Sequence, residues 1–510
     1  MSLKKNVVAN YIGQFYLTVI GIVMVPVYVK YMGAEAYGLV GFFTLMQSWF
    51  QLLDVGLTPT LVRETARFQG GAVDALGLRR LLRALEGFFI AIAFIGGLFL
   101  ALESGHIARG WLKVQHLSLI EVQQSIVLMA IIVALRWICG LYRGAINGFE
   151  RLVWLNSFNV IIASARFLLV ILVFRWVGTR PVHFFGFQLL VAGVEVVTLI
   201  SKTYRLLPAS NCAPLVPWDW KPLRASLGFS LSIAFTGSIW VFVTQTDKLV
   251  LSKLLPLTEY AYFSLAILVA SGILVVIGPV SGVLLPRLAR LVAEGDEGEL
   301  VALYRRGTQA VAVAAVPAAL MLAFFPEQVL WAWTGRPDIA HQAAPVLRLY
   351  ALGNGFMALA AFPYYIQFAK GDLKLHLLGN IMFVVVLIPS LIWAVGLHGA
   401  TGAGWVWLGS NILSFLLWTP VVHHRFLKDI HALWLLTDIV PIVAGPLVLG
   451  YILHGMVIWP GGRSTALLVA IVLGSGLLVT ALLGSSYFRA RVKDLWIRHT
   501  TGVPPDLKPN

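Results

Sequence analysis

Two arginines lie within apolar runs that are long enough to cross a lipid bilayer. Arg136 lies in SIVLMAIIVALRWICGLY and Arg166 lies in LNSFNVIIASARFLLVILVF. A charged side chain at the centre of a bilayer costs roughly 2.5–3.5 kcal/mol on insertion scales, so such residues normally face a bundle interior or a water-filled cavity. Because a guanidinium keeps its charge when dehydrated and binds phosphate through paired hydrogen bonds, we expect an anionic ligand near these residues.

Helical spacing predicts a polar face on each of three consecutive segments, and two of these faces contain the arginines. Residues three, four or seven apart share one face of a helix. In one interpretation, Glu195 neutralises Arg136 or Arg166 and holds the helices together. In the other, at least one arginine meets the ligand, and Glu195 is the countercharge that releases it. The three faces are Arg136, Gly140, Arg143 and Asn147; Asn156, Asn159, Ala163 and Arg166; and Gln188, Glu195 and Lys202.

The elements that position these residues are membrane helices. The chain of 510 residues is 59% hydrophobic and only 12% charged, with a mean hydropathy of +0.84. Soluble domains carry about 25% charged residues. The net charge of +15 does not indicate a nucleic-acid-binding protein, because the basic residues are spread over helix ends. The two cysteines provide no disulfide framework. We therefore predict an all-α polytopic membrane protein.

Apolar runs of about 20 residues recur along the whole chain and predict about 14 membrane spans. Most Lys and Arg residues fall on one side if both ends of the chain are cytoplasmic, which the positive-inside rule favours. In this topology Arg136 lies in the inner half of its span and Arg166 in the outer half, so we expect them to act as successive stations. The predicted spans are 8–29, 37–60, 84–102, 119–142, 152–174, 182–201, 226–247, 260–285, 307–326, 343–368, 375–396, 400–422, 436–458 and 464–484.

Two halves are indicated by a proline-containing connection and a faint repeat. Glu35 and Glu259 follow the first and seventh predicted spans, Arg63 and Arg287 end the second and eighth, and both pairs are 224 positions apart. Two similar bundles around a central cavity are a common transporter plan. The predicted division is an N-terminal lobe at 1–206, a cytoplasmic linker at 207–224, a C-terminal lobe at 225–424, two further helices at 425–484 and a cytoplasmic tail at 485–510.

Two segments carry a family resemblance. Residues 25–67 resemble the N-terminal signature of the Wzx-type polysaccharide-transport flippases; their sequence is VPVYVKYMGAEAYGLVGFFTLMQSWFQLLDVGLTPTLVRETAR. Residues 244–266 resemble the seventh-to-eighth helix junction of the same family; their sequence is TQTDKLVLSKLLPLTEYAYFSLA. That family shares a superfamily with MATE exporters and lipid II flippases. The resemblance implies a V-shaped bundle of two six-helix lobes with two additional helices. It also implies alternating access and a substrate that is an oligosaccharide linked through pyrophosphate to undecaprenol.

Several other polar residues have two interpretations under this resemblance. Two polar stripes either form hydrogen bonds to neighbouring helices or contact sugar hydroxyls. They consist of Asn10, Gln14 and Thr18, and of Ser232, Thr236 and Trp240. Asp247 and Lys248 form either an interfacial pair or an outer gate or ion-coupling site. Asp54 either pairs with Arg63, or gates the inner mouth or binds H⁺ or Na⁺. Arg63 and Arg287 either anchor helix ends to lipid headgroups or capture the pyrophosphate.

We predict a flippase of a bacterial inner membrane that carries lipid-linked oligosaccharides, is monomeric, and needs no cofactor or metal beyond a coupling H⁺ or Na⁺. Expected partners are membrane lipids and the polymerase and chain-length regulator of the glycan pathway, not nucleic acid. One rival is a MATE-type drug exporter, but a cationic substrate favours buried carboxylates. A membrane polymerase or ligase is disfavoured by short outer loops and the lack of an acid–base cluster. A non-transporting scaffold is a third alternative.

Overall fold

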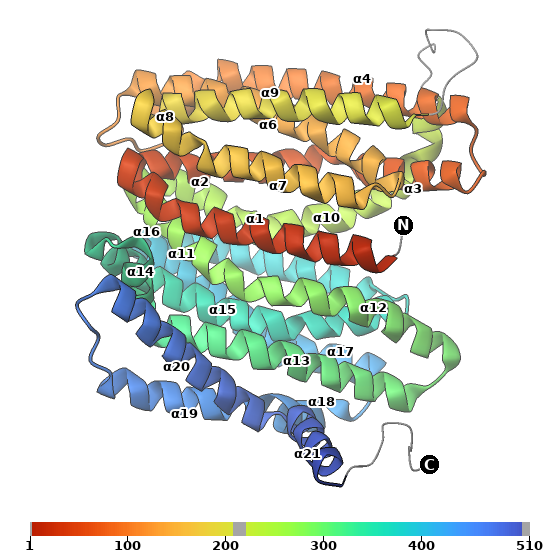
Figure 1. The fold of residues 1–510 in the computed structure, drawn as a ribbon, viewed down its shortest axis with the longest axis vertical. Coiled ribbons are helices and arrows are strands. Elements are labelled where there is room, and N and C mark those ends of the chain that lie inside the picture. Colours follow the sequence, from red (N-terminus) through yellow and green to blue (C-terminus); the bar gives the residue numbers. More distant parts are fainter. Residues whose placement is uncertain (1–2, 208–220, 502–510) are drawn as a thin grey trace. The chain divides into compact units, whose positions relative to one another are not determined.

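The computed structural model describes the backbone of residues 3–207 and 221–501. It describes the side chains of residues 13–207 and 237–493, except Val276 and Pro279. Within this part of the chain the regular secondary structure is helical (Figure 1), as predicted. The chain divides into two compact units, Met1–Ser264 and Leu265–Asn510. Most of the predicted linker at 207–224 lies outside the described residues, and the predicted lobe boundaries stay a prediction.

The first unit is built around the long helix α6, which packs against α3, α4 and α9, while α1 lies along α7 (Figure 1). Its helices are α1 (Leu3–Met32), α2 (Ala34–Phe50), η1 (Gln51–Asp54), α3 (Leu57–Gln69), α4 (Ala75–Leu102), α5 (Ser104–His106), η2 (Ile107–Trp111), α6 (Leu119–Gly148), α7 (Leu152–Leu168), α8 (Val170–Trp176), α9 (Pro181–Leu206), α10 (Lys221–Leu254) and the first half of α11 (Leu257–Ser271).

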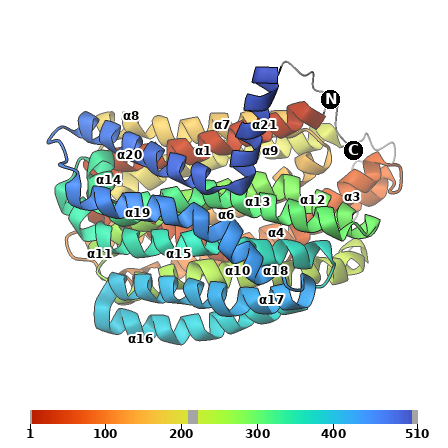
Figure 2. The same ribbon diagram turned by 90° about the horizontal axis from the view of Figure 1, so that it is seen from below.

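The second unit is centred on α13 and α15, which pack against each other, and α13 also contacts α19 and α20. α21 runs across the direction of α20 (Figure 2). The helices are the rest of α11, η3 (Gly272–Val276), α12 (Ile277–Glu294), α13 (Glu297–Phe324), α14 (Pro326–Thr334), α15 (Pro337–Ala369), α16 (Lys374–Leu413), η4 (Ser414–Trp418), α17 (Thr419–Phe426), α18 (Ile430–Leu433), η5 (Trp434–Ile439), α19 (Val440–Met456), α20 (Arg463–Gly484) and α21 (Ser486–Thr501).

Among the described residues, 11 helical stretches are long and apolar enough to cross a membrane. The polytopic class is thus confirmed, but the predicted count of about 14 is not. One stretch, Lys374–Phe426, has 53 residues and bends at Gly399, whose φ of 56° and ψ of −141° are not helical. Glycine adopts this conformation without the Cβ clash that other residues meet. The predicted spans 375–396 and 400–422 lie on either side of this bend.

The helix over the predicted span 37–60 is broken within the span. α2 ends at Phe50, and after the short η1 segment Val55 and Gly56 have φ values of 46° and 72°. A β-branched residue rarely adopts positive φ; such strain costs about 1–3 kcal/mol and persists only where the surrounding structure imposes it. Asp54 stabilises the restart of the helix, since its carboxylate accepts hydrogen bonds from the Thr58 backbone N–H at 3.1 Å and Thr58 Oγ1 at 2.6 Å.

Glycines spaced four residues apart on α6 allow α3 to approach closely. A Cβ on Gly144 would lie 2.8 Å from Thr58 Cγ2, and one on Gly148 would lie 2.7 Å from the Val62 carbonyl oxygen. Small residues at this spacing let membrane helices pack backbone to backbone. The GxxxGxxxG pattern at 140–148 therefore positions α3, together with Asp54 and Thr58, beside α6.

A buried carboxylate secures the loop before α6. Glu35 is 6% exposed and accepts hydrogen bonds from the backbone N–H groups of residues 115–117. The same loop reaches the α10–α11 junction, where the Lys113 ammonium donates to the Leu254 carbonyl at 2.7 Å and Trp111 donates to Ser252 Oγ at 3.0 Å. Glu259, the repeat counterpart of Glu35, is exposed instead, so the faint repeat does not conserve this role.

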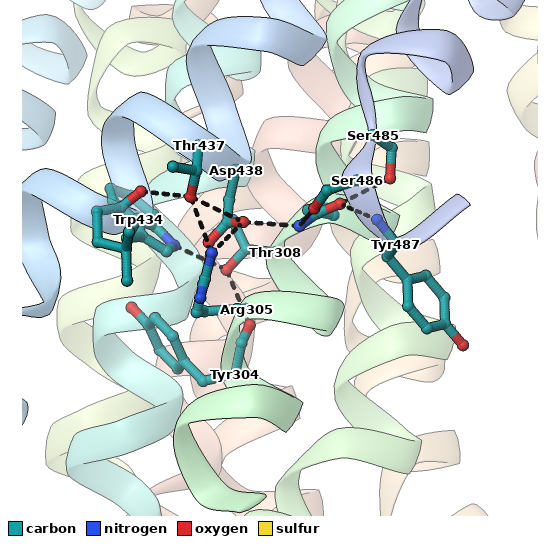
Figure 3. A network of polar contacts seen from close by, with 11 residues as sticks. Tyr304, Arg305, Thr308, Trp434, Thr437, Asp438, Ser485, Ser486 and Tyr487 are labelled. Atoms are coloured by element: carbon teal, nitrogen blue, oxygen red, sulfur yellow. Dashed lines mark hydrogen bonds and ion pairs between the residues drawn. The ribbon is translucent and has the colours of Figure 1, made fainter. Parts of the chain in front are cut away.

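In the second unit, a fully buried aspartate connects α13 to the C-terminal helices (Figure 3). Asp438 accepts from Arg305 Nε at 2.6 Å and Nη2 at 3.0 Å, and from Gln309 Nε2 at 2.7 Å. Gln309 also donates to Ser486 Oγ and accepts from Ser485 Oγ, at the α20–α21 junction. Charge-assisted, bidentate bonds of this kind are the strong ones, so this network holds three helices of the unit in register.

We expect Asp438→Asn to destabilise the second unit, because it leaves Arg305 facing a neutral amide in a buried network. Hydrogen bonds to charged groups contribute about 1.5–3 kcal/mol each. The measurement is the temperature at which the purified protein loses its monodisperse elution profile. The matched control is Asp338→Asn, since the Asp338–Arg336 pair is about half exposed on both sides and such pairs contribute less than about 1 kcal/mol. Equal stability of the two variants would contradict a structural role for Asp438.

Candidate functional site

The charged cluster of the first unit arises where α6, α7 and α9 pack together. Their apolar faces share a core that includes Tyr142, Phe158 and Leu199. Charged residues from all three predicted polar faces meet in one region. There Glu195 is 2% exposed and accepts a hydrogen bond from Arg143 through Oε1 and one from Arg166 through Oε2, the latter at 2.7 Å.

Arg136 is held by different groups. Its Nη2 donates to Gln188 Oε1 at 2.9 Å, and its guanidinium lies 5.1 Å from the centre of the Phe43 ring. Gln188 in turn donates to the Arg166 carbonyl at 3.2 Å. The expectation that Glu195 neutralises Arg136 or Arg166 is thus met for Arg166, but its second partner is Arg143. Gln188 is the residue that connects Arg136 with Arg166.

All three arginines line a single cavity of about 510 Å³. Its walls come from α2, η1, α3, α4, α6, α7 and α9, all within the first unit. Three guanidinium groups thus face two carboxylates, Asp54 and Glu195. The lining residues are Gln47, Phe50, Gln51, Asp54, Thr58, Pro59, Phe89, Val133, Arg136, Trp137, Gly140, Arg143, Arg166 and Glu195.

The predicted separation of Arg136 and Arg166 into successive stations is wrong in this structure, since both residues line the same cavity. The prediction ended one span at 142 and began the next at 152. α6 instead continues to Gly148, and α7 begins at Leu152. Because both arginines then lie roughly three to four helical turns from this short connection, the antiparallel helices bring them to similar depths.

The Nε–H groups of the three arginines are an anomaly within this cluster. In the part of the chain that the structure describes, Arg136 Nε, Arg143 Nε and Arg166 Nε are buried without a hydrogen-bond partner. A buried donor without a partner costs about 1–3 kcal/mol, and more when it is charged. The cluster therefore has unused capacity to bind an anion through its donors, and a small shift of the guanidinium groups would engage it.

Other predicted site residues do not line this cavity. Gln14 is exposed on α1, where its carbonyl accepts from Thr18, and Trp240 on α10 is 52% exposed. Asn159 lies on α7 with its Oδ1 buried and unpartnered among the described residues. Thr236, with Asn10 and Ser232, lies outside the residues whose side chains are described. The sugar contacts assigned to these stripes stay a prediction.

The predicted gating and headgroup residues are distributed over both units. Asp54 is the one that lines the cavity, bonded to Thr58. Asp247 is 3% exposed and accepts from the Lys248 backbone N–H, while the Lys248 ammonium donates to the Thr244 carbonyl at 2.6 Å. Arg63 is exposed on α3, and Arg287 is exposed on α12 in the second unit. Their predicted roles in gating and capture stay predictions.

Sequence analysis missed Gln47, Gln51 and Thr58 as cavity residues. With Asp54 they follow the same 4-3-4 spacing that revealed the arginine face of α6, so the signal was present in the sequence. It was obscured because the broken segment was treated as one apolar span. No group of three or more His, Cys, Asp or Glu residues suited to a metal occurs among the described residues.

Comparison with known proteins agrees with this fold. The model of the family described as "Polysaccharide biosynthesis protein" matches residues 3–292, and the MatE model matches residues 232–393. A Shigella flexneri protein named "Putative O-antigen transporter" is 21% identical over 423 residues, which is 82% of this chain and 97% of that protein.

Two solved structures share the architecture. One is titled "Lipid II flippase MurJ, inward closed conformation"; it has a TM-score of 0.71 at 13% identity and covers 95% of this chain and 99% of its own. The other is an inward-facing multidrug resistance MATE family transporter of the MOP superfamily, with a TM-score of 0.67 at 14% identity over 81% of this chain and 96% of its own. The family resemblance carried by residues 25–67 and 244–266 is confirmed, and the chain belongs to the polysaccharide biosynthesis protein family.

Proposed function

We propose that this protein is a flippase that moves lipid-linked oligosaccharides from the cytoplasmic to the periplasmic leaflet of a bacterial inner membrane. The headgroup of such a lipid is a glycan joined through pyrophosphate to undecaprenol. The observation that carries the proposal is the cavity with three arginines in the first unit. Family membership and the similarity to a protein named as an O-antigen transporter support transport rather than catalysis.

The chemistry of the cavity suits a pyrophosphate. Each guanidinium presents five N–H donors in a planar fork, which matches the oxygens of a phosphate group. Glu195 bonds one side of the Arg143 and Arg166 guanidinium groups. An incoming pyrophosphate offers more acceptor oxygens than one carboxylate, so it takes over part of these bonds. When it leaves, Glu195 re-forms these bonds, so Arg143 and Arg166 keep a counterion throughout.

We further propose the cellular setting of this cycle. The protein lies in the inner membrane with both termini in the cytoplasm, acts as a monomer, and uses an H⁺ or Na⁺ gradient to reset the carrier. The prenyl tail stays in the lipid while the headgroup crosses. The product then passes to the polymerase and chain-length regulator of the same pathway. The basic residues at the predicted cytoplasmic helix ends support this orientation.

The rival function is drug export of the MATE type, which the MatE match over residues 232–393 favours. A cationic drug is attracted by carboxylates that are not already neutralised and repelled by guanidinium groups. In the cavity, Glu195 is already bonded to two arginines and Asp54 to Thr58. The charge of the site therefore favours an anionic headgroup over a cationic drug.

Deletion of the gene should cause the lipid-linked intermediate to accumulate in the inner leaflet, as measured by labelling from either side of the membrane. The wild-type gene should restore export, whereas Arg136→Ala and Arg166→Ala should lower it at least about tenfold, a loss of about 1.4 kcal/mol or more. The control is Arg175→Ala, which removes an exposed arginine from α8 in the same unit. Normal surface glycan in both cavity variants, at wild-type protein levels, would argue against phosphate contact.

Glu195→Gln should have the opposite effect on binding. Because it removes the countercharge while leaving the three arginines, the variant should retain co-purified lipid-linked intermediate at least about tenfold more strongly, or about 1.4 kcal/mol, yet export it more slowly. Native mass spectrometry of the purified variant measures the retained lipid. Glu103→Gln, at a side chain that is 42% exposed, is the control. Weaker retention than in the wild type would show that Glu195 only holds the helices together.

A further inference from the structure

A second wall of the cavity differs chemically from the arginine wall. It is formed by α2, η1 and the start of α3, which contribute Gln47, Gln51, Asp54 and Thr58. Asp54 and Thr58 satisfy each other. The two glutamine side chains, by contrast, have no hydrogen-bond partner within the described part of the chain. They therefore present free amide groups to the cavity.

The two walls suit two different parts of one ligand. An arginine only donates hydrogen bonds, which fits a phosphate, whereas a glutamine amide both donates and accepts. Sugar hydroxyl and acetamido groups also do both, so they match glutamine rather than arginine. Phe50, which lies between the glutamines in the sequence and also lines the cavity, adds an apolar surface for the C–H groups of a sugar ring.

The size of the cavity limits how much of the glycan fits. Its volume of about 510 Å³ lies within the range of pockets that hold small molecules, about 300–1,000 Å³. A pyrophosphate with one sugar is of this size, whereas an entire oligosaccharide must extend beyond it. The sugar inside the cavity is then the one bonded directly to the pyrophosphate, because the arginines and glutamines line the same space.

The backbone next to this wall supports a ligand-binding role. Val55 and Gly56 have positive φ values directly after η1, and strained backbone of this kind is concentrated at functional sites. α2 ends at Phe50, so Gln47 lies in its last turn and Gln51 begins the short η1 turn, and both residues line the cavity.

We propose that Gln47 and Gln51 form a subsite that recognises the polar groups of the sugar attached to the pyrophosphate, and that this subsite sets which lipid-linked glycans the protein accepts. The proposal rests on the flippase function proposed above, since it assumes a pyrophosphate held by Arg136, Arg143 and Arg166. Gln47 and Gln51 are specificity-determining residues, whereas the arginines bind every substrate through the feature that all of them share.

The test uses the purified full-length protein in nanodiscs and compares the affinities of four lipids. The probes are undecaprenyl pyrophosphate without sugar and the same lipid carrying one N-acetylglucosamine, one galactose or one glucose. The wild type should bind at least one sugar-bearing lipid about tenfold or more tightly than the sugar-free lipid. Gln47→Met with Gln51→Met, which keeps side-chain length but removes the amides, should abolish this preference and leave binding of the sugar-free lipid unchanged.

Two further variants separate the alternatives. Arg136→Ala should weaken binding of all four lipids by a similar factor, and Gln124→Met, which removes an exposed amide from α6, should behave as the wild type. A double glutamine variant that keeps the sugar preference, or a wild type without any preference, overturns the subsite while leaving the flippase proposal intact. A wild type that binds none of the four lipids overturns the proposed function itself, and the subsite with it.

Discussion

The first unit depends on the need to compensate guanidinium charges that the fold partly removes from water. Glu195 provides this compensation with one carboxylate, which bonds Arg143 of α6 and Arg166 of α7 from its own position on α9. A buried ion without a partner is strongly unfavourable, so a packing of the three helices that lets Glu195 reach both arginines is stabilised over one that does not. Arg136 is left to Gln188, a neutral group. The cluster is thus stable enough to form yet retains a surplus of positive charge.

The second unit also contains buried charges that must be compensated, but there the compensation is complete. There Asp438 faces a single arginine, and Arg305 bonds it through both Nε and Nη2. Gln309 and the residues of the α20–α21 junction use the remaining hydrogen-bonding groups (Figure 3). Such a satisfied network is structural. The cluster of the first unit has three guanidinium groups, two carboxylates and, among the described residues, three unpartnered Nε–H groups, and this excess of donors supports the proposed binding site.

The break between α2 and α3 affects both the packing of the helices and the chemistry of the cavity wall. The small residues of α6 bring α3 so close that Gly144 has no room for a side chain beside Thr58. The chain does not form one straight helix over 37–60. It turns at Val55 and Gly56, and Asp54 stabilises the start of the next helix. As a result, one segment supplies both a close helix contact and a polar wall. Its glutamines face the cavity, although the segment as a whole is apolar enough to be read as a membrane span.

The sequence by itself determined the membrane class, most of the spans, the family and the identity of the buried arginines, because hydropathy and helical spacing are local properties. It also revealed Arg143 and Glu195 on the correct faces. It did not reveal which groups pair, since Glu195 bonds Arg143 rather than Arg136, nor that Arg136 and Arg166 reach one cavity. Those outcomes depend on the length of α6, on the short turn to α7 and on the break after η1. Only the tertiary structure decides them, because the direction and depth of a side chain depend on how neighbouring helices pack.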